Sequence, residues 1–177
     1  MIRLMVSAAI LAVCGALYGA DTLQDSAAEA PSTLKSVTAG KFTLSYKIDG
    51  KNLSGILTYP AEGWIAVGFG AKSAMSRAHI IQGGIVNQRS VVLEEYGTGM
   101  FSHKPLNQIK GTRTLITGEC TFVRNETTLS FTFPLDNGGN RFASLAPGQQ
   151  IKVIFAYGKG TDLTKKHSDK ASVKITL

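Results

Sequence analysis

Hydrophobic and polar residues alternate along most of the chain after about residue 37, which is the pattern of half-buried β-strands. Phe42, Leu44, Tyr46 and Ile48 would share one face of a strand, and Asp49–Gly50 then predicts a hairpin turn. Further strand-like segments follow at residues 53–59, 63–70, 78–86, 90–96, 112–123, 127–133, 150–157 and 171–177. About nine strands at this spacing, with no sustained helical period, predict an all-β antiparallel sandwich.

The N-terminus has the order of segments found in a secretory signal. Arg3 precedes an apolar run over residues 4–14, and small residues follow up to Ala20. The apolar run is too short to span a bilayer as a mature helix. We therefore expect a signal peptide over residues 1–20, a flexible leader over 21–36 and one folded domain over 37–177.

The two cysteines predict neither a lipid anchor nor a disulfide nor covalent haem attachment in the exported chain. Cys14 leaves with the signal, and Val13 departs from the small residue usual before a lipidated cysteine, so we expect no lipoprotein anchor. Cys120 is then left without a disulfide partner, and no CxxCH is present for covalent haem attachment. No later segment is apolar enough for a transmembrane helix. The expected location is periplasmic or secreted, and not transmembrane.

The formal charge of the chain is +7, and loss of Arg3 with the signal lowers it by one. The lysines are dispersed, and an exported chain without a basic helix is not expected to bind nucleic acid. The densest group comprises Lys159, Lys165, Lys166, Lys170 and Lys174. These lysines either form an ordinary solvated face or attract an acidic partner or an anionic surface.

Three connections are long enough to carry a site. They comprise residues 71–77, 97–111 and 158–170, and hold Met75, His103 and His167 respectively. Because the first follows one strand and the third precedes another, we expect them to converge at one end of the sandwich. A thioether and an imidazole are axial ligands used for haem iron. Met75 would also serve as a packing residue and His167 as a solvated loop histidine, so the residues alone leave both roles open.

The chain resembles the DOMON domain family, in its bacterial branch, over about residues 40–177. The central segments are Gly63–Gly70 with its Gly-Trp pair, then Met75, then Ala78–Gly83. Other matching segments are Glu94–Gly99, Phe101–Pro105, Phe133–Asp136 and Val153–Gly158, continuing to His167. Each segment is weak evidence alone, and their order and spacing together are more specific.

The resemblance implies an immunoglobulin-like sandwich with a pocket that binds b-type haem or a sugar. In haem-binding members the iron ligands are a Met after the Gly-Trp strand and a His before the last strand. Met75 and His167 match these positions, which implies a non-covalent haem b. The family commonly has Asp where this chain has His79, and a Gly is missing after His167. The wider set of expected cofactor contacts comprises His103, His79, Tyr96, Phe101 and Tyr157.

Two functions remain open at this point. The first is one-electron transfer through a Met/His-ligated haem to a redox partner protein, with an acidic partner suggested by the basic charge. The second is an exported module that binds a sugar or copper without haem. Aromatic faces for a sugar would come from Tyr96, Phe101, Tyr157 and Trp64, and copper ligands from Met75, Met100, His103 and His167. No nucleophile elbow or paired carboxylates indicate an enzyme.

Overall fold

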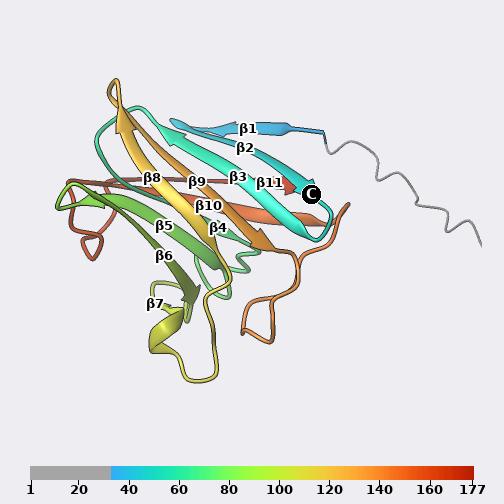
Figure 1. Cartoon of the computed structure of the whole chain (residues 1–177). Coiled ribbons are helices and arrows are strands. Elements are labelled where there is room, and N and C mark those ends of the chain that lie inside the picture. The colour runs from blue at the N-terminus through green and yellow to red at the C-terminus, as the bar shows by residue number, and fades with distance from the viewer. Residues whose placement is uncertain (1–32) are drawn as a thin grey trace, which may run out of the picture.

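The structure, a computed structural model, describes residues 33–177 as two antiparallel sheets packed face to face (Figure 1). The first sheet contains, in spatial order, β1 (Lys35–Ala39), β2 (Phe42–Asp49), β3 (Asn52–Tyr59), β9 (Glu126–Pro134) and β8 (Thr117–Val123). The second contains β11 (Asp169–Thr176), β10 (Gln150–Lys159), β4 (Gly63–Phe69), β5 (His79–Val86), β6 (Arg89–Gly97) and β7 (His103–Pro105). The prediction of an antiparallel sandwich is confirmed, with eleven strands rather than about nine.

The two strands beyond the predicted number are the short edge strands β1 and β7. β1 begins at Lys35, two residues before the expected start of the domain, and pairs with β2 in continuous register. The predicted signal and most of the predicted leader lie outside the described residues. A 3₁₀ turn, η1 (Leu106–Gln108), is the sole helical element of residues 33–177, and no helix there is long and apolar enough to cross a membrane.

The main core lies between the two sheets because each strand alternates its side chains across the pleat. In β2 the burial pattern alternates strictly from Phe42 to Tyr46, and β9 and β10 do the same. The largest fully buried side chains are Phe42, Phe69, Phe133, Leu44, Leu53, Leu57, Ile65, Ile81, Leu106 and Leu129. The turn predicted at Asp49–Gly50 joins β2 to β3, and Gly50 takes the left-handed φ of 57° that this turn needs.

Candidate functional site

The second sheet is apolar on its outer face as well as on the face that meets the core. A second cluster of buried side chains comprises Trp64, Ala66, Ala71, Ala78 and Ile80. Ile65 and Val67 belong to the main core, so the alternating Trp64 and Ala66 must point to the other side of β4. The half-buried Ile154 and Ala156 of β10 extend this cluster. The other sheet does not cover these side chains, so loops that fold over this face bury them.

Met75 packs onto this outer-face cluster from the β4–β5 loop. Its carbonyl oxygen accepts the Ala78 N–H at 3.0 Å, and its own N–H approaches the Met100 carbonyl oxygen at 3.4 Å. Arg77 and Gly97 are joined by a 2.8 Å backbone hydrogen bond, which ties the loop to the end of β6. The β4–β5 loop is therefore anchored to the end of β6 and to the β6–β7 connection, and it holds the Met75 side chain against the outer-face cluster.

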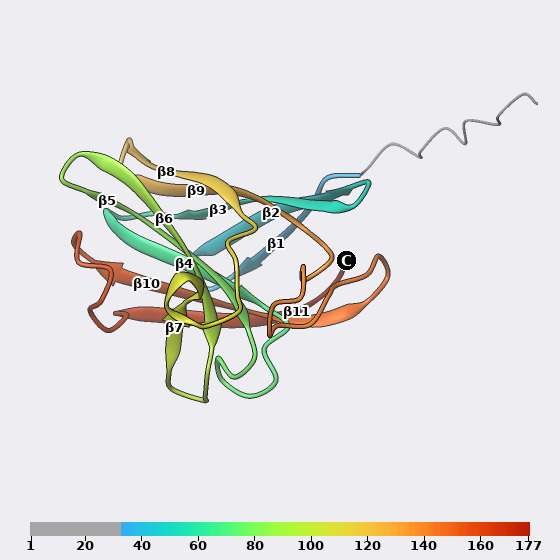
Figure 2. The ribbon, with the colours of Figure 1, turned by 60° about the horizontal axis from the view of Figure 1, so that its bottom comes forward.

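The expectation that the three loops meet at one end of the sandwich is wrong. β10 pairs antiparallel with both β4 and β11, so β4 and β11 run in the same direction. The loop after Phe69 and the loop before Asp169 therefore lie at opposite ends of the second sheet. Figure 2 shows this separation, with the 70–78 loop (green) at the bottom and the β10–β11 loop (red) at the left.

What the two loops share is a face. Leu163, in the β10–β11 loop, packs against the same outer-face cluster as Met75. Its carbonyl oxygen accepts a 2.9 Å hydrogen bond from Gln82 Nε2, and its side chain covers Gly84 of β5. The loop that contains His167 thus folds back over the outer face from its own end.

His167 lies where this loop returns to the sheet. The next residue, Ser168, donates its N–H to the Tyr157 carbonyl oxygen at 2.7 Å. That contact places the segment beside Gly158, whose outer side is covered by the Trp64 indole. Partial burial, followed by the charges of Lys170 and Lys166, lowers the pKa of His167 below its ordinary value. The neutral imidazole so favoured is the form that binds a metal ion.

The position of Met75 depends on the absence of a side chain at Gly97. A Cβ added there would lie 1.7 Å from the Met75 carbonyl oxygen, a backbone atom with little freedom to move. We expect Gly97→Ala to displace the Met75 loop and to lower the free energy of unfolding by about 1–3 kcal/mol, the usual cost of overpacking. Urea unfolding measures this.

Gly99→Ala is the matched control for this substitution. Its added Cβ would meet only the Ser102 hydroxyl, at 2.8 Å, and that rotatable side chain can move away. A loss of stability in Gly99→Ala equal to that in Gly97→Ala would contradict the proposed dependence of the Met75 loop on Gly97.

His103 stands at the β7 edge of the outer face, as part of an ion pair. Its Nδ1 lies 2.7 Å from Glu95 Oε2, and the Glu95 side chain is 5 % exposed. Glu95 pairs with Ile80 across β5 and β6, so it shares the outer face with that residue. Glu95, as hydrogen-bond acceptor and as negative charge, raises the pKa of His103, and partial burial of the ring lowers it by less.

This ion pair predicts a pH dependence of stability. A raised folded-state pKa means that the pair stabilises the fold fully below the ordinary pKa of 6.5 and that this stabilisation is lost as the pH rises through the folded-state value. We expect wild type to exceed His103→Gln in free energy of unfolding by under about 1 kcal/mol at about pH 5, because the ring is partly exposed. The difference should vanish at about pH 9. A difference that grew with pH would contradict this.

Two other predicted site residues lie on the opposite side of the second sheet. His79 is buried in the sandwich, 2.6 Å from Glu94 Oε1 through Nε2, and its ring stacks on Phe142. Tyr157 stacks on Tyr59 in the main core, and its hydroxyl donates to the Glu62 carbonyl oxygen. The structure does not bring His79 or Tyr157 to the face that carries Met75.

The remaining two expected contacts differ in exposure. Tyr96 pairs with His79 across β5 and β6, so it shares the inner face, half-buried. Phe101 is 84 % exposed at the tip of the β6–β7 connection. Neither joins the outer-face cluster, which therefore combines Met75 with the loop of His167 and has His103 at its edge.

The structure also bears on the residues considered for a sugar or for copper. Tyr157 is 6 % exposed in the main core and so offers no free stacking face, whereas Trp64, 5 % exposed, belongs to the outer-face cluster. Cys120 is in the main core, where burial raises the pKa of its thiol to about 11. Among the residues described, no group of three or more His, Cys, Asp or Glu side chains is placed to hold a metal ion.

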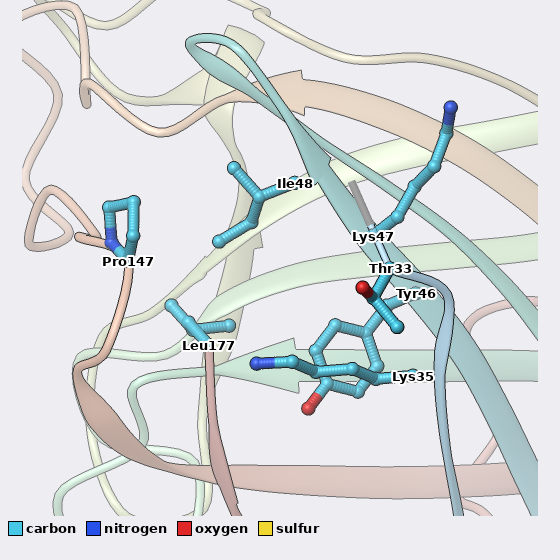
Figure 3. Close-up of a pocket in the computed structure, with 7 residues that line it drawn as sticks. All are labelled: Thr33, Lys35, Tyr46, Lys47, Ile48, Pro147 and Leu177. Carbon is cyan, nitrogen blue, oxygen red and sulfur yellow. The ribbon is translucent and has the colours of Figure 1, made fainter. Parts of the chain in front are cut away.

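Two surface hollows lie away from the outer face. One, of about 220 Å³, is lined by Tyr46, Lys47 and Ile48 of β2 with residues near both ends of the described chain (Figure 3). The other lies over β3, β8 and β9 of the first sheet. Neither is lined by Met75 or His167. The first is also smaller than the roughly 300–1,000 Å³ of typical cofactor pockets.

Sequence patterns missed three residues that shape the site. Glu94 and Glu95 stand in a segment that otherwise reads as an apolar strand, and two carboxylates at such positions were a signal that buried partners must exist. Leu163, a lone apolar residue in a polar loop, was a second signal that this loop packs onto the domain.

The sequence matches a known protein family over most of its length. The DOMON domain family matches residues 38–158, most of the described chain. The chain belongs to the DOMON domain family. The match includes Met75 and ends before His167. The expected ligand role of His167 therefore depends on the resemblance of the C-terminal segment alone. No curated protein matches the sequence.

Two solved structures share the fold of this DOMON domain. The cytochrome domain of cellobiose dehydrogenase from Myriococcum thermophilum aligns over 82 % of each chain with a TM-score of 0.57 and 13 % identity. The cytochrome b domain of pyranose dehydrogenase from Coprinopsis cinerea aligns over 76 % of each chain with a TM-score of 0.53 and 14 % identity. At these identities the likeness concerns the fold.

Proposed function

We propose that this DOMON domain binds haem b non-covalently on the outer face of its second sheet, with Met75 and His167 as axial ligands. It carries single electrons to and from a partner protein after export to the periplasm or the exterior. The family membership supports this, as do two structural neighbours that are both named as cytochrome domains. The alternative of a sugar or copper module has no observation in its favour.

The observation that carries the proposal is the folding of two loops onto one apolar face. The loops of Met75 and His167 leave opposite ends of the second sheet, and each packs against the cluster around Trp64. Together they offer one soft and one nitrogen donor, the pair used by electron-transferring cytochromes. Their arrival from opposite ends suits a flat ligand held between them.

The donor set and the surroundings fit haem in two further respects. Trp64 Nε1 is buried without a hydrogen-bond acceptor in the described part of the chain, and an N–H so placed favours a ligand that brings acceptor oxygens. Ala66 and Ala156 keep the middle of the face flat and apolar. An apolar surround excludes water and holds a cofactor by its surface.

When bound, haem supplies a one-electron couple, and the residues of the chain determine how it is held. The thioether of Met75 would favour the reduced state of the haem and so would raise its reduction potential. Partial burial lowers the pKa of His167 and so favours the neutral imidazole that a metal ion requires. Met75 and His167 would both hold the iron, which would leave no open position for oxygen or a substrate, so one-electron transfer is the chemistry that the haem would supply.

Titration of the purified domain with haem tests this proposal. We expect saturable one-to-one uptake, a sharp Soret band and a low-spin spectrum in the reduced state. Met100→Leu is the matched control, because Met100 is the other thioether of the domain and is 51 % exposed. It should leave the spectrum unchanged. Absence of saturable uptake, or a high-spin reduced spectrum in wild type, would count against the proposal.

A further inference from the structure

We infer that the β6–β7 tip and the adjoining β4–β5 loop form a docking surface for an acidic electron-transfer protein. This inference rests on the proposed function and names the partner's chemistry and the surface that it contacts. The central residues are Met100 and Phe101, and the flanking cations are Lys72, Arg77 and Lys104, a set that we call the cationic tip.

The apolar centre of the cationic tip is exposed and has no packing partner within residues 33–177. Phe101 is 84 % exposed and Met100 51 % exposed, in a domain whose other aromatic residues are mostly packed. The tip is held as a tight turn, since Gly99 donates its N–H to the Ser102 carbonyl oxygen and the Thr98 and Ser102 hydroxyls lie 3.0 Å apart. An ordered, exposed aromatic is a typical anchor of protein interfaces.

The charges around this centre all have one sign. Residues 70–78 and 97–113 contain Lys72, Arg77, Lys104, Lys110 and Arg113 and no Asp or Glu. The acidic residues that adjoin these segments are Glu94 and Glu95, and both are buried and engaged with histidines. A one-sign field of this kind attracts a partner of opposite charge.

The same sign continues along the adjacent part of the sheet. Lys152 of β10 and Lys174 of β11 stand directly opposite each other on the outer face. Like charges in this position destabilise a sheet unless an anionic group neutralises them. Gly70, which opens the β4–β5 loop, donates its N–H to the Lys152 carbonyl oxygen, so this pair adjoins the cationic tip. This end of the second sheet therefore complements an acidic surface.

The cationic tip is also connected to the candidate iron ligand. The Met75 N–H approaches the Met100 carbonyl oxygen, so one backbone contact separates the exposed tip from the thioether loop. Figure 2 shows the two loops projecting side by side at the bottom of the view. A protein docked here would lie close to the proposed cofactor, as transfer of a single electron requires.

An NMR titration tests this surface without requiring haem. The ¹⁵N-labelled domain is titrated at low salt with reduced acidic plastocyanin, and with near-neutral reduced azurin as a charge control. We expect amide shifts at residues 72–77 and 98–104 with plastocyanin only, and binding that weakens as salt is added. Shifts centred on the 160–168 loop, equal effects of azurin, or no shifts would overturn the inference.

Variants separate the two components of the surface. Lys72→Gln combined with Lys104→Gln should weaken plastocyanin binding roughly tenfold, mainly through slower association. Lys41→Gln combined with Arg124→Gln removes two exposed charges from turns of the first sheet and should leave binding unchanged. Phe101→Ser should weaken binding and keep its salt dependence. Equal weakening in the control pair would overturn the inference.

The titration separates failure of this inference from failure of the proposed function. If the domain never takes up haem, the shifts and their loss in the Lys72 and Lys104 variant remain measurable. If haem binds with the expected spectrum but plastocyanin produces no localised shifts, only the docking surface is wrong.

Discussion

His167→Ala is expected to abolish stable haem binding by this DOMON domain. Removing the imidazole leaves a thioether as the sole axial donor, which is a weak anchor. The affinity should fall by at least about 100-fold, beyond the 10–100-fold typical of losing a group that merely supports a metal ligand. Any haem retained should be five-coordinate and high-spin. Haem titration followed at the Soret band measures both effects.

His103→Ala is the matched control for this substitution. His103 is the other partly exposed histidine, and its Nδ1 is engaged by Glu95 at the edge of the outer face. This variant should take up haem with a low-spin spectrum. A His167→Ala variant that binds haem as tightly as wild type, or a His103→Ala variant that loses it, would transfer the ligand role from His167 to another residue.

The second large effect concerns stability, on the inner side of the second sheet. Glu94 has a fully buried side chain, with Oε1 bound to His79 and Oε2 accepting the N–H of Leu115 at 2.6 Å and of Ile116 at 3.3 Å. It joins β5 and β6 to the segment that leads to β8. We expect Glu94→Ala to lower the free energy of unfolding by about 3–5 kcal/mol, because it leaves a buried imidazole and two part-buried amides without their partner.

Glu119→Ala is the control for this substitution, because Glu119 is exposed on β8. Its effect should remain within about 0.5 kcal/mol, as for ordinary surface changes. Equilibrium unfolding in urea compares the two variants. A Glu94→Ala cost below about 1 kcal/mol would show that the buried pair contributes little net stability.

The strands could be predicted because one face of each is buried. The alternation from Phe42 to Ile48 and the Asp49–Gly50 turn locate the β2–β3 hairpin correctly. β1 and β7 were missed because a strand of five or three residues at a sheet edge buries too little to leave a pattern. Short edge strands therefore escape prediction from the pattern of hydrophobic residues.

The site was less predictable because it depends on strand order. Residue patterns do not reveal that β10 lies between β4 and β11, and this order sends the Met75 and His167 loops to opposite ends of the sheet. Without the strand order and register, the sequence also does not tell which face of the sheet each side chain occupies. His79 and Tyr157 were expected beside a cofactor, but the register turns both toward the main core.

The reduction potential of haem-loaded Met75→His most directly tests the claim that Met75 is an iron ligand. A second imidazole favours the oxidised state more than a thioether does, so replacing the sulfur should lower the potential while the spectrum stays low-spin. Met100→His, made in the neighbouring loop, should leave the potential at the wild-type value. We expect a lower potential in Met75→His alone; an unchanged potential in that variant would show that Met75 does not bind the iron.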